Sequence, residues 1–186
     1  MSIVTLSGSH GSHVASIIAS QHKEQPELNG VAPGVEIVSL RIGDPRVSGM
    51  ETHQALLRAS RAIIDSGCDI ANMSFGEDSA WLMERKGAFL EQLIEEVVRK
   101  RDVIFVTSAG NSGPALSTVG SPACSDLLFS IGAYETPSMQ ASMYALLDKV
   151  PASTYTWSSR GPTAQGAVGV TCYSPGAALT GVPSYN

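Results

Sequence analysis

The sequence is poor in charge and in cysteine, and it has no long apolar run. Charged residues make up 16% of the 186 positions, below the roughly 25% typical of globular domains, so we expect a folded chain with much buried backbone. No apolar run approaches the ~18 residues that a membrane-spanning helix requires, and we therefore expect no membrane contact. The first residues lack the basic region and the apolar stretch of a signal peptide.

Positive charge is scarce as well. Twelve Lys and Arg residues face 17 Asp and Glu residues, whereas contact with phosphate needs clustered positive charge. This balance excludes nucleic acid as an expected partner. Cys68, Cys124 and Cys172 are far apart and odd in number, so they form neither a disulfide framework nor a metal-binding pair. They fit a reducing compartment.

Short apolar runs rich in β-branched residues alternate with segments of helical periodicity. This alternation predicts a buried, mostly parallel sheet covered by helices, and the length suits one domain or most of one. The predicted strands span residues 36–42, 69–74, 103–108, 127–133 and 168–173. The predicted helices follow residue 10, span residues 51–66 with a helix-ending glycine at 67, and run from about residue 87 to 101. After residue 135 the pattern weakens, and residues 139–151 form a short helix or an excursion.

A histidine stands at the mouth of the first predicted helix, in the segment SHGSHVAS (residues 9–16). A general base must lie at the edge of an element, open to substrate on one side and to an orienting carboxylate on the other. His10 meets this requirement, whereas His13 begins to face the helix interior. Two histidines three residues apart are also common as packing or capping residues. No carboxylate or thiol lies at zinc-ligand spacing and no acidic loop has calcium spacing, so we expect no metal and no cofactor.

A single asparagine, Asn111, follows the predicted strand at 103–108 in the segment SAGNSGP. Small neighbours let a substrate approach its amide, and a rigid strand end holds that amide still. Those are the requirements of an oxyanion-hole donor. The alternative is that Asn-Ser-Gly-Pro is simply a turn.

The predicted strand at 69–74 ends in Ser-Phe-Gly and is followed by Glu77. A strand edge can bind an extended peptide by backbone pairing, and small residues at that edge leave room for the side chains of the peptide. The segment is therefore a candidate peptide-binding strand.

Together and in this order, these motifs resemble those of the subtilisin-like serine peptidases. The family's histidine block HGTHVAG is HGSHVAS here, its substrate-binding strand NMSLGG is NMSFGE, and its oxyanion loop AAGNSG is SAGNSG. Residues 30–33 (GVAP), 157–162 (WSSRGP) and 174–176 (SPG) match further family blocks, and the resemblance covers roughly residues 8–183. It implies an α/β fold, a subtilisin-like three-layer sandwich with a mostly parallel sheet.

Within the family, the segments between these motifs resemble those of the tripeptidyl-peptidases, for example LRIGD (residues 40–44) and LSTVG (residues 116–120). Those enzymes are very large cytosolic assemblies that remove tripeptides from free N-termini. The resemblance implies a cytoplasmic serine peptidase whose partner is a peptide with a free N-terminus. It also implies a homo-oligomer for the full-length parent.

Carried over residue by residue, the resemblance makes His10 the general base and Asn111 the oxyanion donor. Its substrate-binding strand corresponds here to Ser74, Phe75 and Gly76.

Two glutamates, Glu51 and Glu77, match those that hold the free amino group of the substrate in the tripeptidyl-peptidases. An exopeptidase that counts residues needs anions at a fixed distance from the cleaved bond to pair with an ammonium group. The alternatives are a helix N-terminal acid favoured by the helix dipole for Glu51 and a loop-surface acid for Glu77.

Two members of the Asp–His–Ser triad of the family are missing. None of the nine residues before His10 is acidic, and neither a Gly-Thr-Ser turn nor a Gly-x-Ser-x-Gly elbow occurs. Asp65 begins an Asp-Ser-Gly segment, but it follows the histidine and ends a predicted helix. We therefore expect residues 1–186 to be the central part of a catalytic domain, incomplete at both ends, inactive alone and with uncovered apolar sheet surface.

A second hypothesis is a non-catalytic subtilase-like module that binds peptides or supports assembly. A doubly wound nucleotide-binding domain would fit the alternating pattern, but the sequence has no GxGxxG after a strand and no Walker lysine.

Overall fold

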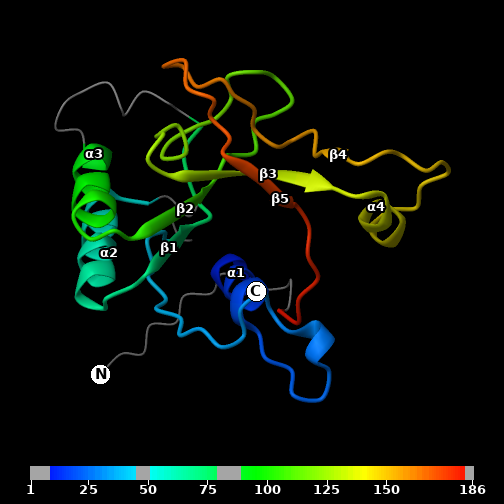
Figure 1. The fold of residues 1–186 in the computed structure, drawn as a ribbon, viewed down its shortest axis with the longest axis horizontal. Coiled ribbons are helices and arrows are strands. Elements are labelled where there is room, and N and C mark those ends of the chain that lie inside the picture. The colour runs from blue at the N-terminus through cyan, green and yellow to red at the C-terminus, as the bar shows by residue number, and fades with distance from the viewer. Residues whose placement is uncertain (1–8, 45–50, 79–88, 183–186) are drawn as a thin grey trace. The chain divides into compact units, whose positions relative to one another are not determined.

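The computed structural model describes residues 9–44, 51–78 and 89–182 of the chain (Figure 1). Contacts between residues divide the chain into two compact units. The first unit comprises Met1–Ser66 and Ala178–Asn186, and the second comprises Gly67–Ala177. None of the helices in the described ranges is both long and apolar enough to cross a membrane.

The first unit begins with the predicted helix at the histidine motif, α1 (Ser9–Ala19). The last carbonyls of a helix have no partner within it, and here the GVAP segment supplies partners from outside. Three bonds of 2.7–3.0 Å run from the N–H groups of Gly30, Val31 and Ala32 to the carbonyls of Ser20, Ile17 and Ile18. A side chain on Gly30 would place its Cβ 2.6 Å from the Ala19 nitrogen, so this close approach requires glycine.

Two further helices belong to the first unit, a 3-10 turn η1 (Pro26–Leu28) and α2 (His53–Asp65). The predicted helix at 51–66 is confirmed with slightly narrower bounds. Thr52 caps its start by accepting a hydrogen bond from the Ala55 N–H at 3.2 Å. Gly67, with φ +64°, follows its end as expected of a helix-ending glycine.

The strand predicted at residues 36–42 is wrong. Among the described residues this segment pairs with no neighbour, and the nearest bridge joins Gly43 to Glu51. A β-branched run forms a strand only where a second strand takes up its backbone N–H and C=O groups. Here Ile37 and Val38 are about half exposed instead.

The second unit contains the sheet, whose strands β1 (Ile70–Met73), β2 (Ile104–Ser108) and β3 (Phe129–Glu135) run parallel in that order. β5 (Cys172–Pro175) pairs parallel with β3. The two-residue strand β4 (Ser153–Thr154) pairs antiparallel with the end of β3. The predicted mostly parallel sheet is therefore confirmed, and Figure 1 shows these strands side by side.

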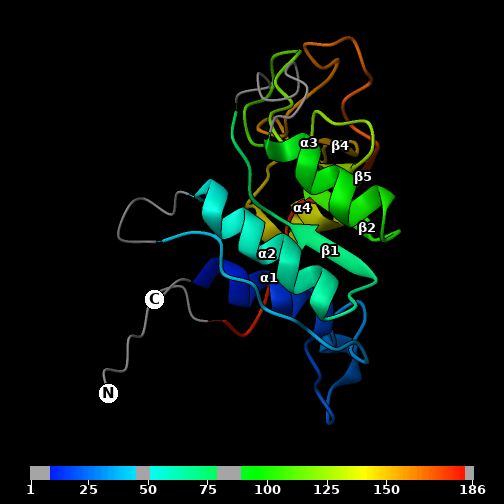
Figure 2. The same cartoon turned by 90° about the vertical axis from the view of Figure 1, so that its left-hand side faces the viewer.

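The helix between β1 and β2 is α3 (Phe89–Ile94), which continues as a π-helical turn η4 (Glu95–Arg99). The predicted start near residue 87 lies outside the described residues. Its apolar side is buried as expected, and it lies beside β2 in both views (Figure 2). Glu96 bonds to Lys100 one turn later, and this bond raises the pKa of Lys100.

The core of the second unit lies between this helix and one face of the sheet. The buried side chains of the helix and of this face are those of Leu93, Ile94, Val97, Ala71, Phe105 and Thr107. Residues on the opposite face, such as Ile70 and Ile104, are about half exposed.

The last part of the second unit differs most from expectation. For residues 139–151 a short helix or an excursion is expected, and the structure has a short helix at their start, α4 (Pro137–Met143), capped by Thr136. The last strand starts at Cys172 rather than at Val168. The residues at the start of the predicted run form a turn instead. Gly169 has φ +90°, and the carbonyl of Ala167, just before the run, accepts from the N–H of Thr163 at 2.8 Å.

Candidate active site

The carboxyl ends of β1 and β2 lie side by side. The two strands are parallel, and their register pairs Met73 with Thr107. The segment Ser74–Gly76 leaves the first strand, and the loop that carries Asn111 leaves the second, at the same edge of the sheet. In open parallel sheets this is the edge at which ligands bind.

Asn111 is exposed, and no hydrogen bond to its amide occurs among the described residues. Its neighbours are held firmly. The Gly110 carbonyl accepts from the Ser159 N–H at 3.0 Å, and the Ser112 N–H donates to Ser159 Oγ at 3.1 Å. Gly110 has φ +112°, and a Cβ there would lie 2.7 Å from Ser159 Oγ. The loop thus combines a fixed backbone with an amide donor that no described residue engages, which is the arrangement an oxyanion hole needs.

The WSSRGP segment, to which the sequence assigns no role, supports the loop that carries Asn111. Ser159 is fully buried beneath the Asn111 loop. Further along, Thr118 and Arg160 exchange two bonds of 2.9 Å, one through the backbone and one through Thr118 Oγ1. The only signal in the sequence is a pair of small hydroxyl residues before Arg-Gly-Pro, and it identifies no partner.

The predicted peptide-binding residues Ser74, Phe75 and Gly76 follow β1 without regular secondary structure. Ser74 Oγ accepts a bond of 3.0 Å from the amide of Asn72. Within the described ranges, the backbone N–H and C=O groups of Phe75 and Gly76 form no backbone hydrogen bond. Such groups at a strand end are available to an extended peptide.

Glu77 follows this segment and is exposed. Its backbone forms an isolated bridge with Ser121, while its carboxylate has no hydrogen-bond partner among the residues that the structure describes. The next residue, Asp78, differs, because its Oδ1 accepts a bond of 2.7 Å from the Ser112 hydroxyl. No pattern in the sequence singles out Asp78 or Ser112.

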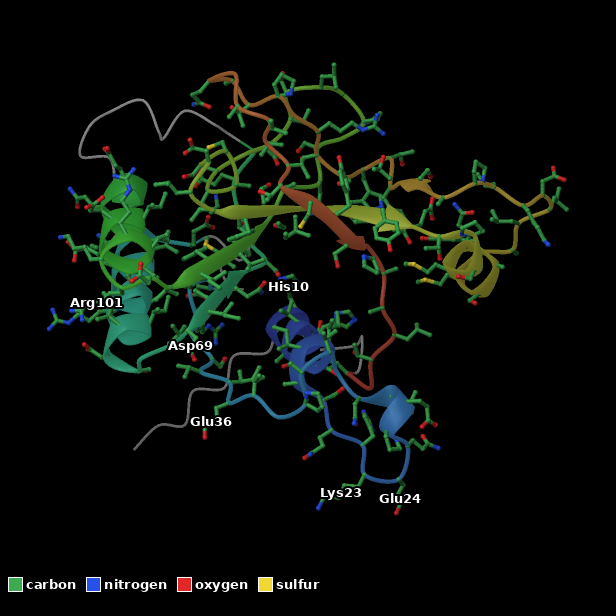
Figure 3. All side chains as sticks on the ribbon, viewed as in Figure 1. His10, Lys23, Glu24, Glu36, Asp69 and Arg101 are labelled. Carbon is green, nitrogen blue, oxygen red and sulfur yellow. The ribbon has the colours of Figure 1, made fainter. Side chains whose placement is uncertain are left out.

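His10 and Glu51 belong to the first unit. His10 is the second residue of α1, is exposed and projects from the N-terminal end of that helix (Figure 3). Glu51 is half-buried and lies one residue before the Thr52 cap, so it stands just outside the helix rather than in its first turn. The structure therefore groups the predicted residues in two sets, these two and the second-unit set of Asn111, Ser74–Gly76 and Glu77.

The three cysteines of the sequence include one, Cys124, that is buried. All three are free, and burial raises the pKa of the Cys124 thiol, which favours the unreactive protonated form. Cys124 lines a hollow of about 360 Å³ in which Asp126 is the one carboxylate. Among the described residues no three His, Cys, Asp or Glu side chains gather closely enough to hold a metal ion.

Comparison with known proteins identifies the class to which this fold and these motifs belong. The chain resembles the prenylagaramide maturation protease PagA with a TM-score of 0.64 at 23% identity, covering 97% of this chain and 57% of that one. It resembles the patellamide maturation protease PatA with a TM-score of 0.61 at 26% identity, covering 90% of this chain and 52% of that one. The predicted subtilisin-like α/β fold is thereby confirmed.

The family follows from the sequence. The model of the subtilase family matches residues 2–185, and the chain belongs to that family. It is 46% identical to tripeptidyl-peptidase 2 of Arabidopsis thaliana over 187 residues, which is 100% of this chain and 13% of that protein. It is also 46% identical to tripeptidyl-peptidase 2 of Caenorhabditis elegans over 184 residues, with 98% and 13% covered. The chain thus spans about an eighth of the length of these relatives.

Proposed function

We propose that these residues belong to a serine peptidase that releases tripeptides from the free N-termini of peptides in the cytoplasm. The observation that carries the proposal is the shared sheet edge, where Phe75 and Gly76, whose backbone groups are unpaired among the described residues, lie beside the loop of Asn111. A peptide bound along Phe75 and Gly76 would present a carbonyl to the amide of Asn111. The likeness to tripeptidyl-peptidase 2 supports the tripeptide specificity.

In the proposed reaction, His10 takes the proton of a serine hydroxyl as that oxygen attacks the scissile carbonyl. The tetrahedral intermediate carries a negative oxygen, to which the Asn111 amide donates. His10 then returns the proton to the leaving amine, and a water molecule hydrolyses the tripeptidyl ester on the serine, which releases the tripeptide and restores the hydroxyl. We assign neither this serine nor the carboxylate that orients the histidine to a residue of this sequence.

Specificity for tripeptides comes from Glu51 and Glu77. Both carboxylates pair with the ammonium group of the substrate, which limits how many residues fit before the cleaved bond. A partly desolvated hydrogen bond to a charged group contributes on the order of 1.5–3 kcal/mol, which is enough to select free over blocked N-termini. In the full-length protein we propose a homo-oligomer, as the likeness to tripeptidyl-peptidase 2 suggests.

A second candidate function is a subtilase-like module that binds peptides without cleaving them. The backbone groups of Phe75 and Gly76, which have no backbone partner in the described part of the chain, favour it, because β-strand addition needs no nucleophile.

Reading the coding sequence on both sides of these residues separates the two candidates. A downstream Gly-Thr-Ser turn and an upstream Asp-Ser-Gly or Asp-Thr-Gly strand support the peptidase. The complete protein should then react covalently with a fluorophosphonate, a probe for activated serines. A stop codon directly after Asn186 with no labelling of the protein would contradict the peptidase and favour the module.

A further inference from the structure

A hydrogen bond joins the loop after β1 to the loop after β2. The Ser112 hydroxyl donates to Oδ1 of Asp78 at 2.7 Å. Ser112 is the residue after Asn111, and Asp78 is the residue after Glu77. A bond from a hydroxyl to a carboxylate is charge-assisted and stronger than a bond between neutral groups.

Ser112 is thereby held at two points. Its N–H donates to the buried Ser159, which also holds the residue on the other side of Asn111 through the Gly110 carbonyl. Its hydroxyl is held by Asp78 from the neighbouring strand end. The backbone of Asn111 is fixed on both sides, while its amide has no partner among the described residues.

The two neighbouring carboxylates are also distinguished by this bond. Asp78 is engaged with Ser112, whereas the Glu77 carboxylate has no hydrogen-bond partner in the described part of the chain. Glu77 is therefore the carboxylate available to an ammonium group, and Asp78 has a different task.

We propose that Asp78 is a positioning residue for the oxyanion donor, acting on Asn111 through Ser112. By its place in the chain it also ties the turn that carries the amino-group anchor, Glu77, to the loop that carries the donor. The proposal rests on the proposed function, because positioning matters only if Asn111 stabilises a transition state. A donor gains its effect from being preorganised, so a small loss of order lowers turnover.

The test is steady-state kinetics of the complete protein on a chromogenic tripeptidyl anilide with a free amino group. The variants are Asp78→Ala, Asp78→Asn, Ser112→Ala and the double alanine variant, each with and without Asn111→Ala. Asp148→Ala removes a carboxylate from an exposed site in the segment after α4 and serves as the matched control. Thermal unfolding of every variant is measured alongside.

We expect Asp78→Ala to lower kcat about 5-fold, which corresponds to the net contribution of one hydrogen bond, with KM nearly unchanged. Asp78→Asn should restore most of kcat, because the amide oxygen accepts the same proton. Ser112→Ala should match Asp78→Ala, and the double variant should lose no more than either. Once Asn111 is alanine, Asp78→Ala should have no further effect on kcat. The Asp148 control should behave as the parent.

Three results would overturn the proposal. The first is an unchanged kcat in Asp78→Ala while Asn111→Ala is impaired, which leaves the oxyanion role intact. The second is an equal loss in both Asn111 backgrounds, which indicates general loosening of the fold. The third is an unchanged kcat in Asn111→Ala itself, which removes the oxyanion role and the positioning role together.

Discussion

The backbones of Glu77 and Ser121 exchange two hydrogen bonds. The Glu77 N–H donates to the Ser121 carbonyl at 2.8 Å, and the Ser121 N–H donates to the Glu77 carbonyl at 2.9 Å. This bridge brings two segments close enough that both adjoining glycines, Gly76 and Gly120, have no room for a side chain. The turn that carries the proposed amino-group anchor is thus held by close backbone contacts, which require glycine at both positions.

Gly120→Ala should disrupt this bridge. A Cβ on Gly120 would overlap the Glu77 carbonyl oxygen, and relieving such an overlap costs about 1–3 kcal/mol. The measurement is urea unfolding of the chain, with a lowered midpoint expected. Gly34→Ala is the control, because a Cβ there meets nothing within 4 Å. Equal midpoints for the two variants would contradict the tight packing of this turn.

Asn111→Ala in the complete protein should lower turnover by roughly 10²–10³, the loss measured when an oxyanion donor of a subtilisin is removed. The KM should change little, because the donor acts in the transition state. Gln54→Ala, which removes an exposed amide on α2, should leave turnover unchanged. Steady-state kinetics check both variants, and full turnover in Asn111→Ala would refute the assignment.

Glu77→Gln should distinguish substrates by their N-termini. Loss of a charged hydrogen bond of about 1.5–3 kcal/mol should weaken a peptide with a free amino group by roughly 10–100-fold. An N-acetylated peptide carries no ammonium and should be cleaved as before. Glu51→Gln should show the same selectivity, and Glu24→Gln, at an exposed site, should show none. Equal losses on both substrates would exclude an amino-group anchor at Glu77.

Local pattern predicted much of the fold because most elements are decided locally. The apolar runs form β1, β2 and β3, which start within two residues of their predicted starts. The Thr52 cap lies at the start of α2, and Gly67 follows its end. The failures concern pairing. Residues 36–42 are as β-branched as a true strand but have no partner among the described residues, and the strand β4 exists only through its pairing with the end of β3.

The candidate site shows the same difference between local motifs and contacts between residues that are distant in sequence. Asn111 and Ser74–Gly76 are predicted from sequence because each lies in a short motif whose chemistry is local. The contacts that hold them were not predictable, since the bond from Ser112 to Asp78 spans 34 residues and the bond to Ser159 spans 47. Periodicity and composition carry no information about such pairs.

A pH dependence follows from Tyr155, which is buried and shares a hydrogen bond of 3.4 Å with the hydroxyl of Tyr144. That bond, with burial, raises the pKa of Tyr155 to about 12, from its ordinary value of 10. The folded state therefore favours the neutral phenol. This contribution to stability is fully present below about pH 10 and is lost as pH rises toward 12.

Comparison of the parent with Tyr144→Phe checks this dependence. The parent should lose stability between about pH 8 and about pH 11, and the variant should lose less because the pKa of its Tyr155 lies nearer 10. Urea unfolding at both pH values gives the two differences. Identical pH dependence in parent and variant would rule out a contribution from this hydroxyl pair.

The sheet face opposite α3 carries a row of apolar side chains that should make the isolated 186-residue chain prone to self-association. Register places Ile70 beside Ile104 and Val106 beside Phe129. Ile70, Ile104 and Phe129 are 60%, 48% and 47% exposed. Contiguous apolar patches of this kind are rare on soluble monomers and mark surfaces that another element covers.

We therefore expect the isolated chain to bind the dye ANS in its folded state and to self-associate as its concentration rises. Ile104→Thr with Phe129→Thr should reduce both effects, because threonine keeps the β-branched shape but adds a hydroxyl. Leu147→Thr is the control, since Leu147 is fully exposed but lies outside the sheet. Sedimentation and dye fluorescence measure the two effects. A monomer without dye binding would mean that the chain covers this face itself. Undiminished self-association of the double variant would mean that another surface is responsible for the association.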